Sequence, residues 1–503
     1  MTTTRTANLS SSATGERYNA SLILDANLEA GRGGKVAIRT PEGGELTYAE
    51  LAAMAARVGH MLRSLGVQRE QRVLMVMDDT PAFPASFLGA MRIGAVPVPV
   101  NPLDKLDNFR HYLADSDARV AIADANLMPL VIEARGDGDA MLVVANGETE
   151  GAIKLEDAIA ELPGELPALD THRDDAAFWL YSSGSTGMPK GVVHLHHDIA
   201  FTCETYAREI LQITEADVTY STTKLFHAYG LGNGLSFPYS VGATTVLSSG
   251  RSNPARALGI VERFHPTLFF SVPALYRAML DQEPADLSSV RMCVSAAEPL
   301  HPSIEERWEE RYGVPIVDGI GSTEMLHIYC SNRAGDVRRG TSGKPVRGYE
   351  LRLVDLDGHP VEGDEPGQLM VRGDSCAAYY WRQHEKSKRC MVGDWFATGD
   401  RYRVTEDGYY VYEGRMDDML KVGGLWVSPA DMETALMQHP GVREAVVIGV
   451  EVEEVSRIKA FVIADGEGDD ALAHELRGWC KERLRRYEYP HLVEFVEDFP
   501  RTV

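Results

Sequence analysis

Cysteine, long apolar runs and positive charge are all scarce in this chain of 503 residues. Its six cysteines are scattered without a C-x-x-C pair, so we expect free thiols and neither disulfides nor structural zinc. No run of 18 apolar residues occurs, which argues against a membrane-spanning helix, and the first residues lack the apolar stretch of a signal peptide. These absences predict a cytoplasmic protein with no membrane partner.

The charge balance is strongly acidic. Lysine and arginine number 50 against 74 aspartates and glutamates, which gives a formal net charge of -24. A phosphate backbone selects basic surfaces, so we expect no nucleic-acid partner, although a small anionic substrate can still meet local basic residues. At this length, and with 44% hydrophobic residues, the chain should form two or more globular domains.

Helical and strand patterns alternate from about residue 30, which predicts mostly parallel α/β layers. Thr47 and Glu50 fit a capping box, and apolar residues then recur at helical spacing until Gly66. A second helix is expected over Pro81–Arg92. The expected strands are Arg72–Met77, Val96–Val100, Arg119–Ala123, Ala176–Leu180, Thr244–Leu247, Leu268–Ser271 and Ile316–Val317.

The pattern changes twice toward the C-terminus. From about residue 340 to 414, Gly- and Asp-rich turns separate short strands, which predicts a β-rich subdomain of a large N-terminal domain over 1–416. Ser428 and Pro429 then fit the N-cap and first turn of a new helix, and two strands and a helix at 471–486 follow. We therefore expect a small α+β C-terminal domain over 417–503.

The segment Tyr181–Lys190 is the most informative. Serines, a threonine and glycines follow the apolar run Ala176–Leu180, and the segment ends in Pro-Lys. A loop of this composition presents backbone N–H groups and hydroxyls to phosphate oxygens, and Lys190 adds a positive charge. The alternative is a flexible linker, but linkers rarely follow a buried strand. The spacing also differs from that of the P-loop, so another nucleotide-binding fold is expected.

Four further clusters have functional and structural interpretations. Lys224–Gly232 could wall an apolar pocket with His227 at its rim, or His227 could be structural. Asp318–Glu324 follows a strand and could hold Mg²⁺ through Glu324, or form a tight turn. Asp400 could hold ribose hydroxyls, and Arg415 the same sugar or a phosphate, although a turn carboxylate and a surface ion pair are the plain alternatives.

Together, and in this order, these motifs resemble those of the adenylate-forming superfamily, which includes acyl-CoA synthetases, luciferases and the adenylation domains of peptide synthetases. The resemblance covers essentially the whole chain. It implies a large N-terminal domain of layered sheets and helices and a small mobile C-terminal domain that turns about Asp417.

The resemblance also implies ATP, Mg²⁺ and coenzyme A as cofactors and assigns residues to them. Thr186 and Glu324 would coordinate Mg²⁺, and the catalytic set would be Lys190, Thr186, His227, Glu324 and Arg415, with His227 as a gate between the half-reactions. The residues expected to bind ATP are Ser182, Ser183, Gly184, Ser185, Thr186, Gly187, Lys190, Ala296, Ala297, Glu298, Pro299, Asp318, Gly319, Ile320, Ser322, Thr323, Asp400 and Arg415, and those lining the pantetheine tunnel are Gly423, Gly424 and Trp426.

Two departures from the family pattern stand out. Ile320 stands where relatives commonly carry an aromatic residue against adenine, and a branched aliphatic side chain can still cover the ring. The pattern also continues from Pro500-Arg501-Thr502 to a Gly-Lys whose lysine serves adenylation. We expect that lysine in a short tail beyond Val503.

Among the members of the superfamily, the chain most resembles benzoate-type aryl-CoA ligases. The residues expected to bind the acid are Phe226, Ala228, Tyr229, Gly319, Gly321, His327 and Ile328. Tyr229, Ile328 and the two glycines would form a flat slot, Ala228 would leave room for a ring, and His327 would offer one polar contact. Benzoate and aminobenzoates such as anthranilate are the leading candidates, followed by hydroxybenzoates.

The predicted reaction is ATP-dependent activation of an aromatic carboxylate as an acyl adenylate, followed by formation of the CoA thioester. Two alternatives remain open: transfer to an acyl carrier protein, whose pantetheine carries the same thiol, and nucleotide binding without catalysis. Hydrolase chemistry is disfavoured because neither Ser183 nor Ser185 lies in a G-x-S-x-G motif. The oligomeric state, monomer or homodimer, is left open.

Overall fold

The computed structural model describes residues 15–184, 187–355, 357–361, 364–416, 420–422, 425–427, 429–452, 455–484 and 488–499. The chain divides into two compact units. The first comprises Met1–Leu351 and Val371–Phe396, and the second comprises Arg352–Met370 and Ala397–Val503. The fold is mixed α/β, as expected. The predicted hinge, Asp417, lies outside the described residues, so the boundary expected there stays a prediction.

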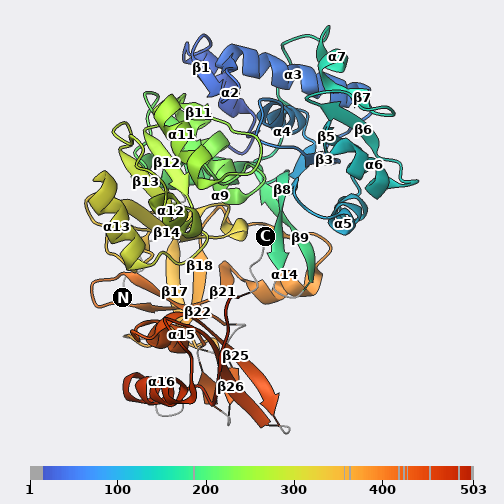
Figure 1. Cartoon of the computed structure of the whole chain (residues 1–503). Coiled ribbons are helices and arrows are strands. Elements are labelled where there is room, and N and C mark those ends of the chain that lie inside the picture. The colour runs from blue at the N-terminus through green and yellow to red at the C-terminus, as the bar shows by residue number, and fades with distance from the viewer. Residues whose placement is uncertain are drawn as a thin grey trace, which may run out of the picture. The chain divides into compact units, whose positions relative to one another are not determined.

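The first unit contains a nine-stranded sheet with a parallel centre and antiparallel edges (Figure 1). Its strands, in spatial order, are β16 (Lys344–Pro345), β15 (Ile328–Ser331), β14 (Ile316–Gly321), β13 (Met292–Ser295), β12 (Leu268–Ser271), β10 (Val218–Ser221), β11 (Thr244–Val246), β1 (Val36–Arg39) and β2 (Glu45–Thr47). The crossover helices begin with proline in their first turn, where the missing N–H costs nothing. They are α11 (Pro254–Phe264), α12 (Pro273–Leu280) and α13 (Pro302–Tyr312).

A second, fully parallel sheet lies in the N-terminal part of the same unit. Its order is β4 (Val96–Pro99), β3 (Arg72–Val76), β5 (Val120–Asp124), β6 (Met141–Ala145) and β7 (Ile153–Lys154). The accompanying helices are α2 (Leu22–Glu29), α3 (Tyr48–Ser64), α4 (Ala82–Arg92), α5 (Leu106–Ser116), α6 (Met128–Arg135) and α7 (Leu155–Ile159). The capping box predicted at Thr47 and Glu50 is confirmed at the start of α3.

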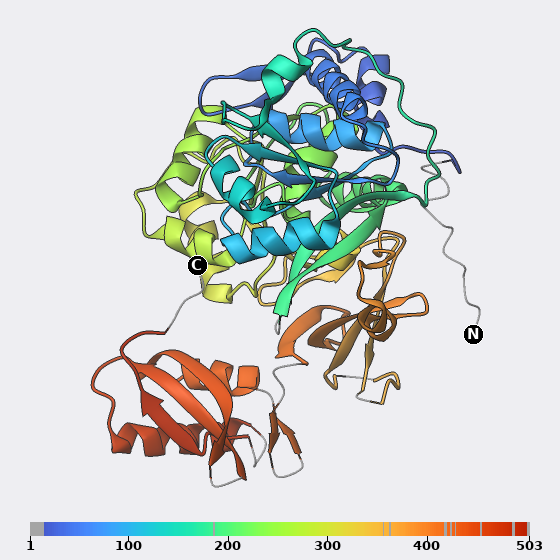
Figure 2. The same cartoon turned by 90° about the vertical axis from the view of Figure 1, so that its right-hand side faces the viewer.

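The segment predicted to bind phosphate is part of a β-hairpin, and the expectation of a loop over the whole of 181–190 is wrong. Strand β8 (Ala176–Gly184) pairs with β9 (Gly187–Leu195), and β19 (Tyr379–Tyr380) extends the sheet on the far side of β9. The pairing continues to Gly184 and Gly187 because cross-strand hydrogen bonds satisfy the backbone up to the tip. This long ribbon is prominent in Figure 2.

Short helical segments complete the first unit. These are α8 (His196–Thr202), η1 (Cys203–Ile210), α9 (Ala228–Leu231), η2 (Gly232–Ser236), α10 (Phe237–Val241), η3 (Thr323–Met325) and α14 (His384–Cys390), with strand β20 (Met391–Val392) after the last. Two of them, η1 and η2, are π-helical. This conformation is rare in proteins overall, but where it occurs it is often at a functional site.

The second unit begins with β-strands and ends in an α+β core. Its first part holds β17 (Glu350–Val354), β18 (Gly367–Arg372), β21 (Trp395–Val404) and β22 (Tyr410–Arg415). The elements that follow are β23 (Leu420–Val422), β24 (Leu425–Val427), α15 (Pro429–Met437), β25 (Val442–Val452), β26 (Val455–Ala464), α16 (Asp470–Arg483) and β27 (Leu492–Phe495). Val427, Met432, Leu436, Ile458 and Leu476 share one buried cluster, so this part has a core of its own.

All six cysteines are free, as the sequence predicts, and four of them are buried. Among the described helices, none combines the length and the apolar character that crossing a membrane requires.

Candidate functional site

The β8–β9 hairpin places Ser182 opposite Lys190, and both lie next to Glu324. Ser182 and Lys190 are directly paired across the two strands. The Ser182 hydroxyl lies 3.5 Å from Glu324 Oε1, at the limit of a hydrogen bond. The structure therefore brings together three residues that were predicted from two separate motifs. Ser185 and Thr186, at the hairpin tip, lie outside the described residues, as do the side chains of Ser183, Gly184 and Gly187.

Glu324 is held on η3 by contacts to both its side chain and its backbone. Ser322 caps this short helix by accepting a hydrogen bond from Met325 N–H. The Tyr380 hydroxyl donates to Glu324 Oε1 at 2.8 Å, and Ala377 N–H donates to the Glu324 carbonyl at 2.7 Å. The carboxylate is thereby fixed in place before any ligand binds.

Tyr380 also supports Lys190. The Lys190 ammonium lies 5.4 Å from the centre of the Tyr380 ring, within range of a cation–π contact. Burial, together with the neighbouring Lys386 ammonium, lowers the pKa of Lys190 to about 8. Burial and the Glu324 charge raise the pKa of Tyr380, so its hydroxyl remains a donor. Sequence reasoning missed Tyr380, whose only signal was the aromatic run Tyr379-Tyr380-Trp381, and it missed Lys386, which has no local signal.

The two segments expected to flank adenine leave the ends of adjacent parallel strands. Ser295 at the end of β13 is in register with Asp318 on β14. Ala297, in the loop after β13, has a φ of 79°, a left-handed conformation that is costly for a residue with a Cβ. Burial raises the pKa of Asp318 well above its usual value, so this carboxyl prefers its neutral form. The remaining residues of the two segments are Ala296, Glu298, Pro299, Gly319, Ile320, Ser322 and Thr323.

The glycines of β14 allow β15 to approach closely. A Cβ on Gly321 would lie 2.6 Å from the His327 carbonyl oxygen, and one on Gly319 would lie 2.8 Å from the Cys330 carbonyl oxygen. Such contacts are closer than real Cβ atoms make, so both positions need glycine. Ile328, opposite Gly321 in the β14–β15 pairing, is buried.

His327 is enclosed by aromatic rings. Its ring centre lies 4.5 Å from that of Phe237, 4.9 Å from Tyr206 and 5.5 Å from Tyr229. Burial lowers the pKa of His327 to about 3, so the imidazole is neutral. The structure therefore joins the predicted Tyr229 and His327. Tyr206 and Phe237, which sequence reasoning missed, come from η1 and α10 and show no local signal.

The polar atoms around His327 define its tautomer. Its Nε2 lies 3.2 Å from Asn233 Oδ1, and a carbonyl oxygen can only accept, so Nε2 carries the hydrogen. His327 Nδ1 is buried and has no hydrogen bond of normal geometry, although the backbone of Tyr229 lies close enough to the ring to affect its pKa. Tyr229 donates its hydroxyl to the Val294 carbonyl at 3.1 Å, which fixes its ring, and Ala228 is buried beside it.

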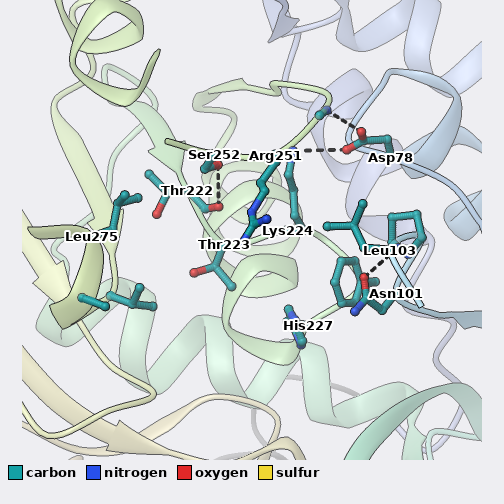
Figure 3. A pocket seen from close by; sticks show the side chains of 15 residues that line it. Asp78, Asn101, Leu103, Thr222, Thr223, Lys224, His227, Arg251, Ser252 and Leu275 are labelled. Atoms are coloured by element: carbon teal, nitrogen blue, oxygen red, sulfur yellow. Dashed lines mark hydrogen bonds and ion pairs between the residues drawn. The ribbon is translucent and has the colours of Figure 1, made fainter. Parts of the chain in front are cut away.

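Phe226 and His227 face a different space, a cavity of about 440 Å³ (Figure 3). Lys224, Arg251, Ser252 and Leu275 are among the other residues that line it. The His227 ring is exposed to the cavity, but desolvation by the surrounding protein lowers its pKa to about 4, so it is neutral at pH 7.

The wall of the cavity is held by charged groups. The Lys224 ammonium pairs with Asp78 Oδ1 at 3.1 Å and donates to the Ser248 carbonyl. Asp79, with its pKa raised to about 7 by burial, accepts a hydrogen bond from Leu225 N–H at 3.0 Å. These contacts fix the backbone that leads into His227.

In the second unit, Asp400 and Arg415 are paired with each other. They are opposite in the β21–β22 pairing, and Arg415 Nη1 lies 2.7 Å from Asp400 Oδ1. This contact is the ion pair that the sequence left as the plain alternative, and ribose binding by the two residues stays a prediction. Trp426 lies on β24 opposite Lys421. Gly423 and Gly424 lie outside the described residues.

The donor set around Glu324 is appropriate for Mg²⁺. This ion prefers carboxylate and hydroxyl oxygens together with phosphate oxygens of the substrate. Glu324 and Ser182 supply such oxygens side by side, next to the Lys190 ammonium. A separate group of Asp355, Asp357 and His359 is exposed and belongs to a turn.

Comparison with known proteins gives consistent similarities. Residues 25–381 match the family model "AMP-binding enzyme", and residues 431–503 match "AMP-binding enzyme C-terminal domain". The chain is 46% identical to a benzoate–CoA ligase of Thauera aromatica, over 97% of this chain and 94% of that protein.

Two solved structures are similar over nearly the whole chain. One is the anthranilate CoA ligase AuaEII in complex with anthranoyl-AMP, at 40% identity and a TM-score of 0.89, covering 98% of this chain and 96% of that one. The other is a benzoate CoA ligase from Burkholderia xenovorans LB400, at 42% identity and a TM-score of 0.87, covering 96% of this chain and 97% of that one.

Proposed function

The chain belongs to the AMP-binding enzyme family, and on that premise we propose that it is an AMP-forming aromatic acid–CoA ligase whose substrate is benzoate or a monosubstituted benzoate. The observation that carries the proposal is the position of His327. This buried, neutral ring lies three residues after Glu324 and is enclosed by Tyr206, Tyr229 and Phe237. A small aromatic acid suits such surroundings better than a flexible chain does.

In the first half-reaction, a carboxylate oxygen of the acid attacks the α-phosphorus of ATP, and pyrophosphate leaves. Lys190 and the backbone of the β8–β9 hairpin face the phosphates and stabilise the charge that develops on them. Mg²⁺, when bound at Glu324, supplies further neutralisation of phosphate charge. Tyr380 holds both the lysine and the carboxylate in position.

In the second half-reaction, the thiol of coenzyme A attacks the acyl carbonyl of the adenylate, and AMP leaves. We propose that the thiol arrives through the cavity lined by His227, Lys224 and Arg251. The neutral imidazole of His227 can act as a gate that closes this cavity during the first half-reaction and opens it for the second. Its rotation is easy because a neutral ring carries no charge that would have to be desolvated. Asp417, Gly423, Gly424 and Trp426 remain the proposed hinge and tunnel residues.

A second substrate class is favoured by the Nδ1 atom of His327, which has no hydrogen bond of normal geometry. Because Nε2 donates to Asn233, Nδ1 can accept a hydrogen bond from an amino or hydroxyl substituent on the ring. We therefore place 2-aminobenzoate beside benzoate, with hydroxybenzoates next. The solved relative that carries anthranoyl-AMP is consistent with this choice.

Release of AMP from a panel of acids tests the proposal. Benzoate, 2-aminobenzoate, the hydroxybenzoates, octanoate and palmitate are each incubated with ATP, Mg²⁺ and free coenzyme A. We expect a benzoate to be the best substrate and free coenzyme A to be sufficient as acceptor. Preference for octanoate or palmitate would contradict the acid assignment. Adenylate without turnover on free coenzyme A would favour a carrier protein, and absence of any turnover would favour the non-catalytic alternative.

A further inference from the structure

A buried histidine–aspartate pair lies behind the Glu324 loop. His194 is on β9, four residues after Lys190, and Asp198 is in the first turn of α8. Both side chains are fully buried. The imidazole stacks on Phe178 of β8, with ring centres 5.2 Å apart and planes within 19° of parallel. A polar pair at such depth is costly unless its hydrogen bonds are made, so its partners are informative.

Both ring nitrogens of His194 face acceptors. Nδ1 lies 2.8 Å from Asp198 Oδ2, and Nε2 lies 2.8 Å from the carbonyl oxygen of Thr323. Asp198 Oδ2 also accepts a hydrogen bond from Leu195 N–H at 3.1 Å. A carbonyl can only accept, so Nε2 donates to Thr323, and Nδ1 shares a hydrogen with the Asp198 carboxyl group.

The Thr323 carbonyl is the backbone group immediately before Glu324. It lies 129 residues from His194 in sequence, so the hydrogen bond joins β9 to η3 across the fold. On the other side of Glu324, its own carbonyl accepts from Ala377 N–H, and its carboxylate accepts from Tyr380. The peptide groups before and after Glu324 each accept a hydrogen bond from outside η3, in addition to the Leu326 N–H bond to Thr323 within it, and His194 donates one of the two.

We propose that His194 and Asp198 are a positioning pair that sets the Thr323–Glu324 backbone so that the Glu324 carboxylate faces Ser182 and Lys190. Groups behind a metal ligand commonly control its orientation and the affinity of the site. The inference rests on the proposed function only in taking Glu324 as the ligand of Mg²⁺. Strand β9 then positions two groups of the proposed phosphate site. It carries Lys190 itself, and it positions Glu324 through His194.

A purely structural role makes a different prediction. If His194 only fills space against Phe178, its loss lowers the free energy of unfolding but leaves the metal dependence of the folded protein unchanged. If it positions Glu324, the Mg²⁺ dependence changes in the fraction that is folded. A substitution of His194 that keeps a hydrogen-bond donor for the Thr323 carbonyl should then preserve the Mg²⁺ affinity better than a substitution that keeps only the volume of the side chain.

Three variants and a control separate these roles. His194→Leu removes both ring nitrogens, His194→Gln keeps an amide N–H as a donor for the Thr323 carbonyl, and Asp198→Asn replaces the carboxyl group by an amide of the same shape. The control is His439→Gln, because His439 is another buried histidine paired with a carboxylate, Glu475 at 3.2 Å, in the core of the second unit.

The readout is ATP binding to the full chain by titration calorimetry across a range of Mg²⁺ concentrations, without any acid present. Hydrogen exchange of amides 322–326 is measured in parallel on the ligand-free protein. We expect His194→Leu to raise the half-saturating Mg²⁺ concentration about tenfold, the scale set by one lost hydrogen bond to a buried group. Exchange at 322–326 should become faster. His194→Gln and Asp198→Asn should lie between His194→Leu and the wild type, and His439→Gln should match the wild type.

Unchanged Mg²⁺ dependence in folded His194→Leu would overturn the proposal, and so would His194→Gln behaving like His194→Leu. If His194→Leu does not fold, the comparison of His194→Gln and Asp198→Asn with the control decides by the same criterion. These binding measurements do not depend on which aromatic acid the protein activates, because no acid is present. If the wild type binds Mg²⁺ and ATP but activates no aromatic acid, the proposed function fails while the positioning role is still tested.

Discussion

The proposed phosphate side, around Glu324, and the proposed acid side, around His327, differ in their electrostatic character. Around Glu324 the groups are charged and hold one another, with Lys190, Lys386 and Tyr380 close together. Around His327 the groups are aromatic and neutral, because burial lowers the pKa of the imidazole to about 3. The first region should therefore respond to changes of charge and the second to changes of volume.

The largest effect should follow from removing the Glu324 charge. Glu324→Gln keeps the shape of the side chain but weakens the Mg²⁺ site, and loss of one preorganised charge-stabilising group costs roughly 100- to 1000-fold in rate. The loss is measured as the rate of pyrophosphate release in the first turnover. Glu204→Gln, which removes a partly exposed carboxylate paired with Arg208, is the control and should leave the rate unchanged. A wild-type rate in Glu324→Gln would refute the metal assignment.

The acid side should fail through crowding. Ala228→Leu adds three carbons at a buried position beside Tyr229, and overfilling costs about 1–3 kcal/mol, or roughly 5- to 150-fold in kcat/KM for benzoate. ATP binding measured by calorimetry should not change, since the two sides are separate. Ala228→Gly is the matched variant that should retain activity. Equal loss of ATP binding and benzoate use would show that the two regions are not independent.

How far the sequence predicts this site depends on the distance over which each contact is made. Residues that lie in short segments of distinctive composition could be identified from the sequence. These are the hydroxyl- and glycine-rich run at 181–190, the motif that ends in Glu324, and the residues Tyr229 and His327. The paired strands of the hairpin were missed, because serine and glycine favour loops locally and only the β8–β9 register overrides that preference.

Tyr380, Asn233 and His194 were missed for another reason. Each acts on a residue 56 or more positions away, through hydrogen bonds that no local pattern encodes. The boundary at Asp417 and the tunnel residues Gly423 and Gly424 lie outside the described residues, and they stay predictions.

A smaller effect should follow from the tyrosine that joins the groups of the phosphate side. Tyr380→Phe removes the donor to Glu324 but keeps the ring beneath Lys190. We expect about a tenfold loss in pyrophosphate release, because a hydrogen bond to a charged group is lost and the cation–π contact remains. The same variant should not alter the order of preference among acids. A changed preference would mean that Tyr380 reaches the acid side.

The smallest effect is a shift in pH dependence. The pKa of Lys190 is lowered to about 8, so its positive charge is present below that pH and is lost as the pH rises through it. ATP binding should weaken along the same rise. Lys386→Gln removes a neighbouring positive charge, which raises the pKa of Lys190 and moves the weakening to higher pH. Calorimetric titrations with ATP between pH 6 and 10 measure the affinity of both proteins. If the two proteins lose affinity over the same pH range, Lys386 is not a cause of the lowered Lys190 pKa.

The central claim is best tested by identifying the products of a single turnover. The protein is mixed with ATP, Mg²⁺ and benzoate, quenched, and examined by mass spectrometry; coenzyme A is then added to a second portion. We expect benzoyl-AMP in the first portion and its conversion to benzoyl-CoA and AMP in the second. An ATP-bound protein that forms neither product with benzoate or 2-aminobenzoate, yet forms an adenylate with a long-chain acid, would contradict it.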